Sequence, residues 1–160
     1  RPAGVAISLL VIHGISLPPG EFGGPWIERL FLGKLKTDTP PALADLAGLR
    51  VSAHLLIRRT GKVIQFVPFK RRAWHAGVSS FEGRPRCNDY SIGIELEGTD
   101  TSPYADVQYA KLSALCRMLM CRYPAITSHR IVGHCHIAPD RKTDPGPSFD
   151  WRRLHEGLTR

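Results

Sequence analysis

Residues 7–12 read ISLLVI, and His13 follows them directly. A run this rich in branched apolar side chains is typical of a strand covered on both faces, because a strand with one wet face alternates polar and apolar residues. A secretory signal also contains an apolar run, but no small-residue cleavage pattern follows this one. The stretch therefore predicts a buried core strand with His13 at its end.

Residues 91–97 read SIGIELE and predict a second strand. Their alternation places Glu95 and Glu97 on one face and the apolar side chains on the other. Gly61 lies between two further β-favouring runs, which favours a hairpin. The remaining strand candidates are thus residues 51–57 and 62–68, joined as that hairpin, and the weaker residues 126–133.

Three segments have helical patterns. Residues 26–31 form a short one with Pro25 as its first helical residue, and residues 102–122 form a long one that Pro124 ends. Residues 149–158 close the chain as a third helix. Strands and helices interleave with one hairpin, so we expect an α/β fold: a single domain with a mixed central β-sheet flanked by helices.

Composition narrows the class of protein. The chain has 160 residues, 42% of them hydrophobic, enough for one core, and no apolar run reaches the roughly 18 residues of a membrane span. A net charge of +8 favours anionic partners, but no nucleic-acid-binding motif accompanies it. Four unevenly spaced cysteines do not form the disulfide framework of a small secreted domain, so we expect a cytoplasmic protein.

Two segments are predicted to be loops, residues 37–41 and residues 70–90. The second carries Gly, Ser, Pro and Asn throughout. Because loops of this length are uncommon unless they are functional, it is a place to look for binding residues.

Seven histidines are available as metal ligands. His13 and His134 each follow a strand candidate, and Asp144 lies in a rigid Pro-rich run that can return a carboxylate to the same place. A hydrolytic zinc site needs three protein ligands and one open position. Spacing alone does not distinguish such ligands from packed or surface histidines.

Five blocks extend over nearly the whole chain and resemble the AmpD-type branch of the N-acetylmuramoyl-L-alanine amidases, which are related to phage lysozyme-type amidases and peptidoglycan recognition proteins. The blocks are residues 15–27 (ISLPPGEFGGPWI), 50–54 (RVSAH), 73–79 (AWHAGVS), 87–100 (CNDYSIGIELEGTD) and 133–151 (GHCHIAPDRKTDPGPSFDW). The resemblance implies the amidase and recognition-protein fold, with residues 1–160 as a zinc amidase domain trimmed at its N-terminus.

The resemblance also assigns the chemistry. It implies that Zn²⁺ is held by His13, His134 and Asp144, with Glu95 as the catalytic acid and base and Lys142 as the catalytic lysine. Zinc activates water at neutral pH, a carboxylate moves its proton, and a cation stabilises the oxyanion. A surface lysine is the alternative for Lys142.

Substrate contacts are expected from four residues. Trp74 and His75 offer flat faces for a sugar ring or peptide, while Arg50 and Arg86 match family positions that hold substrate carboxylates. The alternative for both arginines is a solvated surface position.

Other residues in the blocks have weaker assignments. Glu97 is the rival of Glu95 because the two share a strand face. His54 is expected in the core or behind the site, and His136 behind the site or at the surface. Strand alternation is expected to turn Cys135 away, and Gly14 replaces an Asn that the family uses to contact substrate.

The predicted function is zinc-dependent hydrolysis of the amide bond between (1,6-anhydro-)N-acetylmuramic acid and L-alanine of muropeptides, in peptidoglycan recycling. The alternative is a non-catalytic peptidoglycan-binding module of the recognition-protein type. The enzyme is expected to act in the cytoplasm as a monomer on an anionic muropeptide, with neither nucleic acid nor membrane as a partner.

Overall fold

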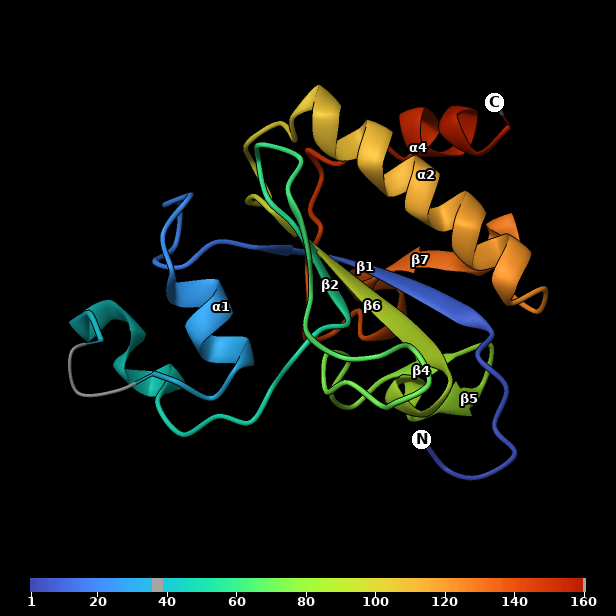
Figure 1. Cartoon of the computed structure of the whole chain (residues 1–160), viewed down its shortest axis with the longest axis horizontal. Coiled ribbons are helices and arrows are strands. Elements are labelled where there is room, and N and C mark those ends of the chain that lie inside the picture. The colour runs from blue at the N-terminus through green and yellow to red at the C-terminus, as the bar shows by residue number, and fades with distance from the viewer. Residues whose placement is uncertain (36–38, 160) are drawn as a thin grey trace.

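The computed structural model describes residues 1–35 and 39–159. A five-stranded sheet in the order β3-β2-β6-β1-β7 forms its centre (Figure 1). Four of the strands run parallel to one another, and β3 is antiparallel to β2 at one edge. The predicted mixed α/β sheet is confirmed. The strands are β1 (Leu9–Ile15), β2 (Leu55–Ile57), β3 (Val63–Gln65), β6 (Ser91–Glu97) and β7 (Ile131–Gly133).

Strand β1 is buried on both faces, as its sequence predicts. Leu10 and Ile12 join a core cluster that includes Leu112 of α2 (Asp106–Arg122) and Leu154 of α4 (Trp151–Leu158). Leu9 packs on the opposite face in a second cluster with side chains such as Tyr90. Each fully buried Leu or Ile contributes about 1.5–3 kcal/mol. The central position of β1 therefore follows from its unbroken apolar run.

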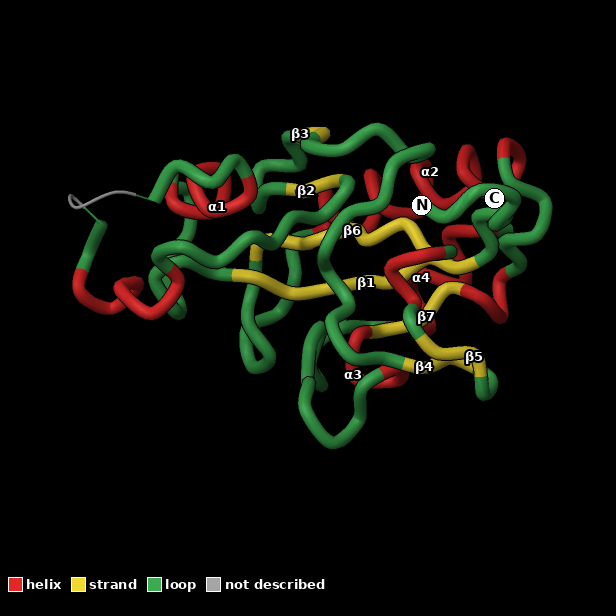
Figure 2. The backbone as a smooth tube through the Cα atoms, turned by 90° about the horizontal axis from the view of Figure 1, so that it is seen from below, coloured by secondary structure: helices red, strands yellow, loops and turns green. Residues whose placement is uncertain are grey.

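Helices α2 and α4 lie side by side over one face of the sheet (Figure 1). The opposite face carries the short helix α3 (His134–Ile137) and the ribbon of β4 (Ser80–Phe81) and β5 (Arg84–Pro85). Helix α1 (Trp26–Phe31) lies at one end of the molecule, away from α4 (Figure 2).

Several predicted boundaries are wrong. The strands β2, β3 and β7 are shorter than expected because the chain on either side turns into loops or, before β7, into the turn η3 (Ser128–Arg130). Helix α2 begins at Asp106 because the Gln108 side chain accepts the Ala105 N–H at 3.0 Å. Pro25 caps α1 from outside, and α4 begins two residues later than expected.

The two predicted loops have different outcomes. Residues 70–90 contain β4, β5 and the turn η2 (Cys87–Asp89), so they are more ordered than a plain loop. Residues 37 and 38 of the predicted loop 37–41 lie outside the described residues, and Pro41 begins the 3-10 helix η1 (Pro41–Leu46).

Candidate metal and active site

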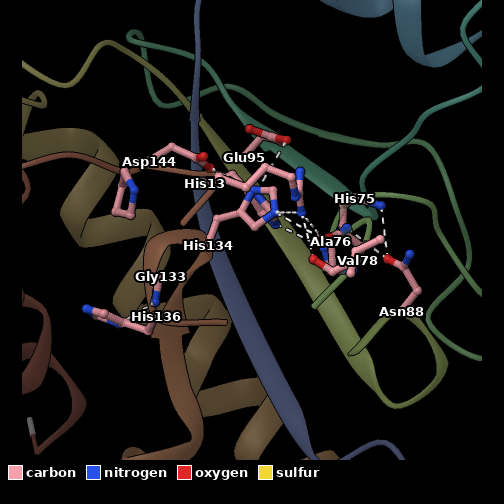
Figure 3. Close-up of polar contacts among 12 residues, drawn as sticks. His13, His75, Ala76, Val78, Asn88, Glu95, Gly133, His134, His136 and Asp144 are labelled. Atoms are coloured by element: carbon pink, nitrogen blue, oxygen red, sulfur yellow. Dashed lines mark hydrogen bonds and ion pairs between the residues drawn. The ribbon is translucent and has the colours of Figure 1, made fainter. Parts of the chain in front are cut away.

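The candidate ligands meet where parallel strands end. His13 lies on β1 in register with Glu95 on the adjacent β6, and β1 also pairs with β7, after which His134 begins α3. Asp144 returns from the loop after α3, as Figure 3 shows. The carboxyl ends of parallel strands are where open α/β sheets place their sites.

Three ligand atoms form a close triangle. His13 Nδ1 lies 3.1 Å from His134 Nδ1 and 3.1 Å from Asp144 Oδ2, and His134 Nδ1 lies 3.2 Å from Asp144 Oδ2. With zinc bonds of about 2.0–2.1 Å at tetrahedral angles, such atoms would be separated by about 3.3 Å. The donor set and its spacing fit a zinc ion with a fourth position open.

Protonation in the cluster also suits a cation. Burial lowers the pKa of His13 despite the nearby Asp144 carboxylate, which favours the neutral imidazole that a metal requires. Burial alone would raise the pKa of Asp144, but the adjoining His13 and His134 imidazoles hold it below its ordinary value. The cluster therefore combines a neutral imidazole with an ionised carboxylate.

The Glu95 carboxyl is buried beside this triangle, and among the described residues one of its oxygens has no hydrogen-bond donor. Its Oε1 lies 4.0 Å from His13 Nδ1, and its Oε2 has no hydrogen-bond partner among the described residues. Burial and the Asp144 carboxylate raise the pKa of Glu95 well above its ordinary value, while Lys142 opposes them. A buried carboxyl with a raised pKa that faces a metal site is typical of a general acid or base.

Glu97, the rival acid, is fully engaged elsewhere. Its Oε1 accepts the Gly23 N–H and an Arg58 N–H, both at 2.7 Å, and its Oε2 accepts the Arg59 N–H at 3.1 Å. Burial alone would raise the pKa of Glu97, but these donors hold it below its ordinary value. The two acids share a strand face, but the hydrogen bonds of Glu97 make it a structural residue, whereas Glu95 is available for catalysis.

A cavity of about 270 Å³ opens over the cluster. Glu95 and Lys142 line it together with the three candidate ligands, so the structure brings all five of these residues to one place. Apolar side chains form most of the remaining wall: Ile15, Leu30, Phe31, Leu46, Leu49, Val51 and Trp74.

The four expected substrate contacts are placed differently. Trp74 lines the cavity, is half exposed, and has the Arg72 guanidinium over its ring at 4.2 Å. His75 also lines the cavity, but its ring hydrogen-bonds to His13. Arg50 lines a neighbouring pocket of about 310 Å³ that shares three leucines with the first.

Arg86 is the one of the four that lines neither of these pockets. It has a positive φ of 64° and pairs with Asp89 at 3.1 Å.

His54 is buried behind the site, as expected, and accepts the Gly93 N–H at 3.0 Å. His136 accepts the Gly133 N–H at 3.0 Å and faces Trp151, away from the cluster. The alternation argument for Cys135 is wrong, because His134 and Cys135 lie in α3 rather than in a strand.

Three contributors were missed from the sequence. They are Asn88, Gly93 and Tyr104. Asn88 and Gly93 contact His75, and the Tyr104 hydroxyl lies 2.3 Å from where a Cβ on Gly14 would be. That hydroxyl donates to the carbonyl of Pro145, next to Asp144, at 2.9 Å. Gly93 shares its face of β6 with Ser91, Glu95 and Glu97, and a glycine between those polar side chains was the signal available.

The sheet with its ligand triangle, buried carboxyl and cavity defines a candidate metal-dependent hydrolase. The model of the N-acetylmuramoyl-L-alanine amidase family matches residues 3–147, and the chain belongs to this family. It is therefore an enzyme, an N-acetylmuramoyl-L-alanine amidase, and the predicted resemblance to the AmpD-type branch is confirmed.

Within the family, the chain is 62% identical over 159 residues to the 1,6-anhydro-N-acetylmuramyl-L-alanine amidase AmpD of Citrobacter freundii, covering 99% of this chain and 84% of the relative. A crystal structure of a selenomethionine AmpD derivative superimposes with a TM-score of 0.92 at 62% identity, over 96% of this chain and 85% of that one.

A more distant structure is the Escherichia coli amidase AmiD in complex with its substrate anhydro-N-acetylmuramic acid-L-Ala-D-gamma-Glu-L-Lys. It has a TM-score of 0.70 at 30% identity, over 98% of this chain and 60% of that one. Among the described residues, no helix is long and apolar enough to cross a membrane.

Proposed function

We propose that this amidase uses Zn²⁺ to hydrolyse the bond between 1,6-anhydro-N-acetylmuramic acid and L-alanine in recycled muropeptides. The observation that carries the proposal is Glu95, a buried carboxyl whose Oε2 has no partner in the described part of the chain and which adjoins three converging candidate ligands. A binding module has no use for an unpaired buried acid, which costs free energy. The alternative of a non-catalytic peptidoglycan-binding module is therefore not favoured.

His13, His134 and Asp144 would hold the metal. A bound zinc supplies Lewis acidity and lowers the pKa of bound water to about 7. The Glu95 carboxylate takes the proton of the attacking water and delivers it to the leaving alanine nitrogen, a role that contributes about 10²- to 10⁴-fold. The Lys142 ammonium stabilises the negative charge that develops on the amide oxygen.

The size and the lining of the cavity favour a small, partly apolar group of the substrate as its occupant. Its volume of about 270 Å³ and its apolar wall suit a single sugar with an adjoining peptide bond. Trp74 offers a ring to stack on, and Arg50 in the adjacent pocket offers a guanidinium for a stem-peptide carboxylate. Arg86 remains a predicted substrate ligand, to be tested by Arg86→Ala. His75 faces His13, so its predicted substrate role is weaker.

The similarity to AmpD and to the AmiD complex supports an anhydro-muropeptide as the substrate. The net charge of +8 favours an anionic stem peptide. We further propose that residues 1–160 act as one zinc amidase domain, as a monomer in the cytoplasm, with neither nucleic acid nor membrane as a partner.

The test compares two substrates at equal muramyl concentration. Products released from anhydro-muropeptides and from intact sacculi are identified by mass spectrometry, with and without a chelator. We expect chelator-sensitive release of the stem peptide, and faster release from the anhydro-muropeptide. Equal or faster cleavage of sacculi would contradict the recycling role, and activity that survives complete metal removal would contradict the zinc mechanism.

A further inference from the structure

His75 and Ala76 lie beside the ligand triangle, and between them they contact both of its histidines (Figure 3). Each imidazole presents Nδ1 to the triangle, so the direction of each ring depends on what its Nε2 contacts. Partners behind metal-binding histidines fix the tautomer and the ring orientation.

The first contact is made by the His75 side chain. His75 Nδ1 lies 2.9 Å from His13 Nε2, and His75 Nε2 lies 3.2 Å from Ser91 Oγ. With His13 Nδ1 reserved for the metal, His13 Nε2–H must donate to His75 Nδ1, and His75 Nε2–H then donates to Ser91. Each group in this chain therefore donates to the next one, from His13 through His75 to the Ser91 hydroxyl.

The fold makes room for this ring. A Cβ on Gly93, in the middle of β6, would lie 2.5 Å from the His75 ring. The missing side chain lets the imidazole rest directly on the strand beside His13. This packing holds the ring where its Nδ1 can accept.

The second contact is made by the backbone of the next residue. The Ala76 carbonyl lies 3.1 Å from His134 Nε2 and also accepts a hydrogen bond from Arg141 at 2.8 Å. Arg141 Nη2 also lies 3.4 Å from His134 Nε2, but the carbonyl contact is shorter and a carbonyl only accepts, so we assign the hydrogen to His134 Nε2. Its Nδ1 then has a free lone pair toward the triangle.

One amide oxygen fixes both contacts. Asn88 Oδ1 accepts the His75 N–H at 3.1 Å and the Ala76 N–H at 2.9 Å. Asn88 is itself buried and lies in η2, at the start of the block that continues into β6. This one acceptor therefore fixes the backbone at His75 and Ala76. The His75 side chain then orients His13, and the Ala76 carbonyl orients His134.

We propose that His75 and Asn88 are positioning residues that preset both histidine ligands, His75 by accepting from His13 and Asn88 by holding the Ala76 carbonyl against His134. This inference rests on the proposed metal centre. It assigns His75 to the metal side of the cavity wall rather than to the substrate.

The test uses matched variants of the whole chain. His75→Leu removes the acceptor at similar volume, whereas His75→Asn keeps an oxygen near the position of Nδ1. Asn88→Ala removes both hydrogen bonds, whereas Asn88→Asp keeps an acceptor. The readouts are zinc affinity by chelator competition, the Tm of the metal-free protein, and the KM for an anhydro-muropeptide at saturating zinc.

We expect His75→Leu and Asn88→Ala to lower zinc affinity about 10- to 100-fold, with His75→Asn and Asn88→Asp within about threefold of wild type. The His75 pair decides the matter if Asn88→Ala does not fold. Unchanged zinc affinity in His75→Leu, or an equal loss in His75→Asn, overturns the inference. A raised KM with wild-type zinc affinity in His75→Leu would show that His75 contacts the substrate instead. A wild-type chain that binds no zinc would instead contradict the proposed function.

Discussion

The two acids of β6 permit a test in which one substitution removes activity and the other removes stability. Glu95→Gln and Glu97→Gln are the same near-isosteric change on one strand face, two residues apart. Glu95 has an unpartnered oxygen, whereas Glu97 accepts three hydrogen bonds and pairs with the buried Arg58. The variants should therefore fail in different ways.

The magnitudes follow from these partners. Glu95→Gln removes the proton carrier and should lower turnover by about 10²- to 10⁴-fold, with zinc content unchanged. Its unfolding free energy should stay within about 1 kcal/mol of wild type, because the 4.0 Å contact of Glu95 with His13 Nδ1 is too long for a hydrogen bond. Glu97→Gln removes the buried carboxylate from Arg58, whose remaining partners include the half-exposed Glu28 and the Gly24 carbonyl, which should cost about 3 kcal/mol and lower the Tm by roughly 6–12 °C.

The pH dependence adds an independent check. The pKa of Glu97 in the fold lies below its ordinary value of 4.5, so its ionised form contributes stability above that pH. The Tm difference between wild type and Glu97→Gln should therefore be constant near neutrality and shrink as the pH falls below about 4.5.

Calorimetry, zinc analysis and product release from an anhydro-muropeptide measure these effects on the same samples. Turnover of Glu95→Gln within about threefold of wild type would refute its role as proton carrier. A fully stable but inactive Glu97→Gln would show that the assignment of the two acids is reversed.

Three further predictions concern the other site residues. Asp144→Ala should lose most of its zinc on dialysis, because two histidines alone hold the ion weakly; full zinc occupancy by metal analysis would remove Asp144 from the ligand set. Lys142→Met should retain zinc but lower kcat about 10²- to 10³-fold, whereas an unchanged kcat would make it a surface lysine. Trp74→Ala should raise KM severalfold in steady-state assays at full zinc content, and an unchanged KM would exclude stacking.

Much of the fold could be predicted from local pattern. The unbroken apolar run before His13 predicts a central strand, and the structure buries it between two clusters. Helix α1 over residues 26–31 was also predictable, although Pro25 caps the helix and is not its first residue. The ends of β2 and β7 were not, because β-propensity continues past the point where pairing with a neighbouring strand stops.

The sequence by itself, through its motif blocks, determined the family and pointed to the ligand, acid and lysine positions, because those residue types recur in long and specific blocks. Only the tertiary structure decided that Glu97 is hydrogen-bonded through both oxygens while Glu95 Oε2 has no partner among the described residues, since that depends on Arg58 and on the Gly23 and Arg59 backbones, all distant in sequence from β6. It likewise decided that His75 faces His13. The physical reason is that alternation fixes the side of a strand on which a side chain lies, whereas its hydrogen bonds depend on which distant segments pack there.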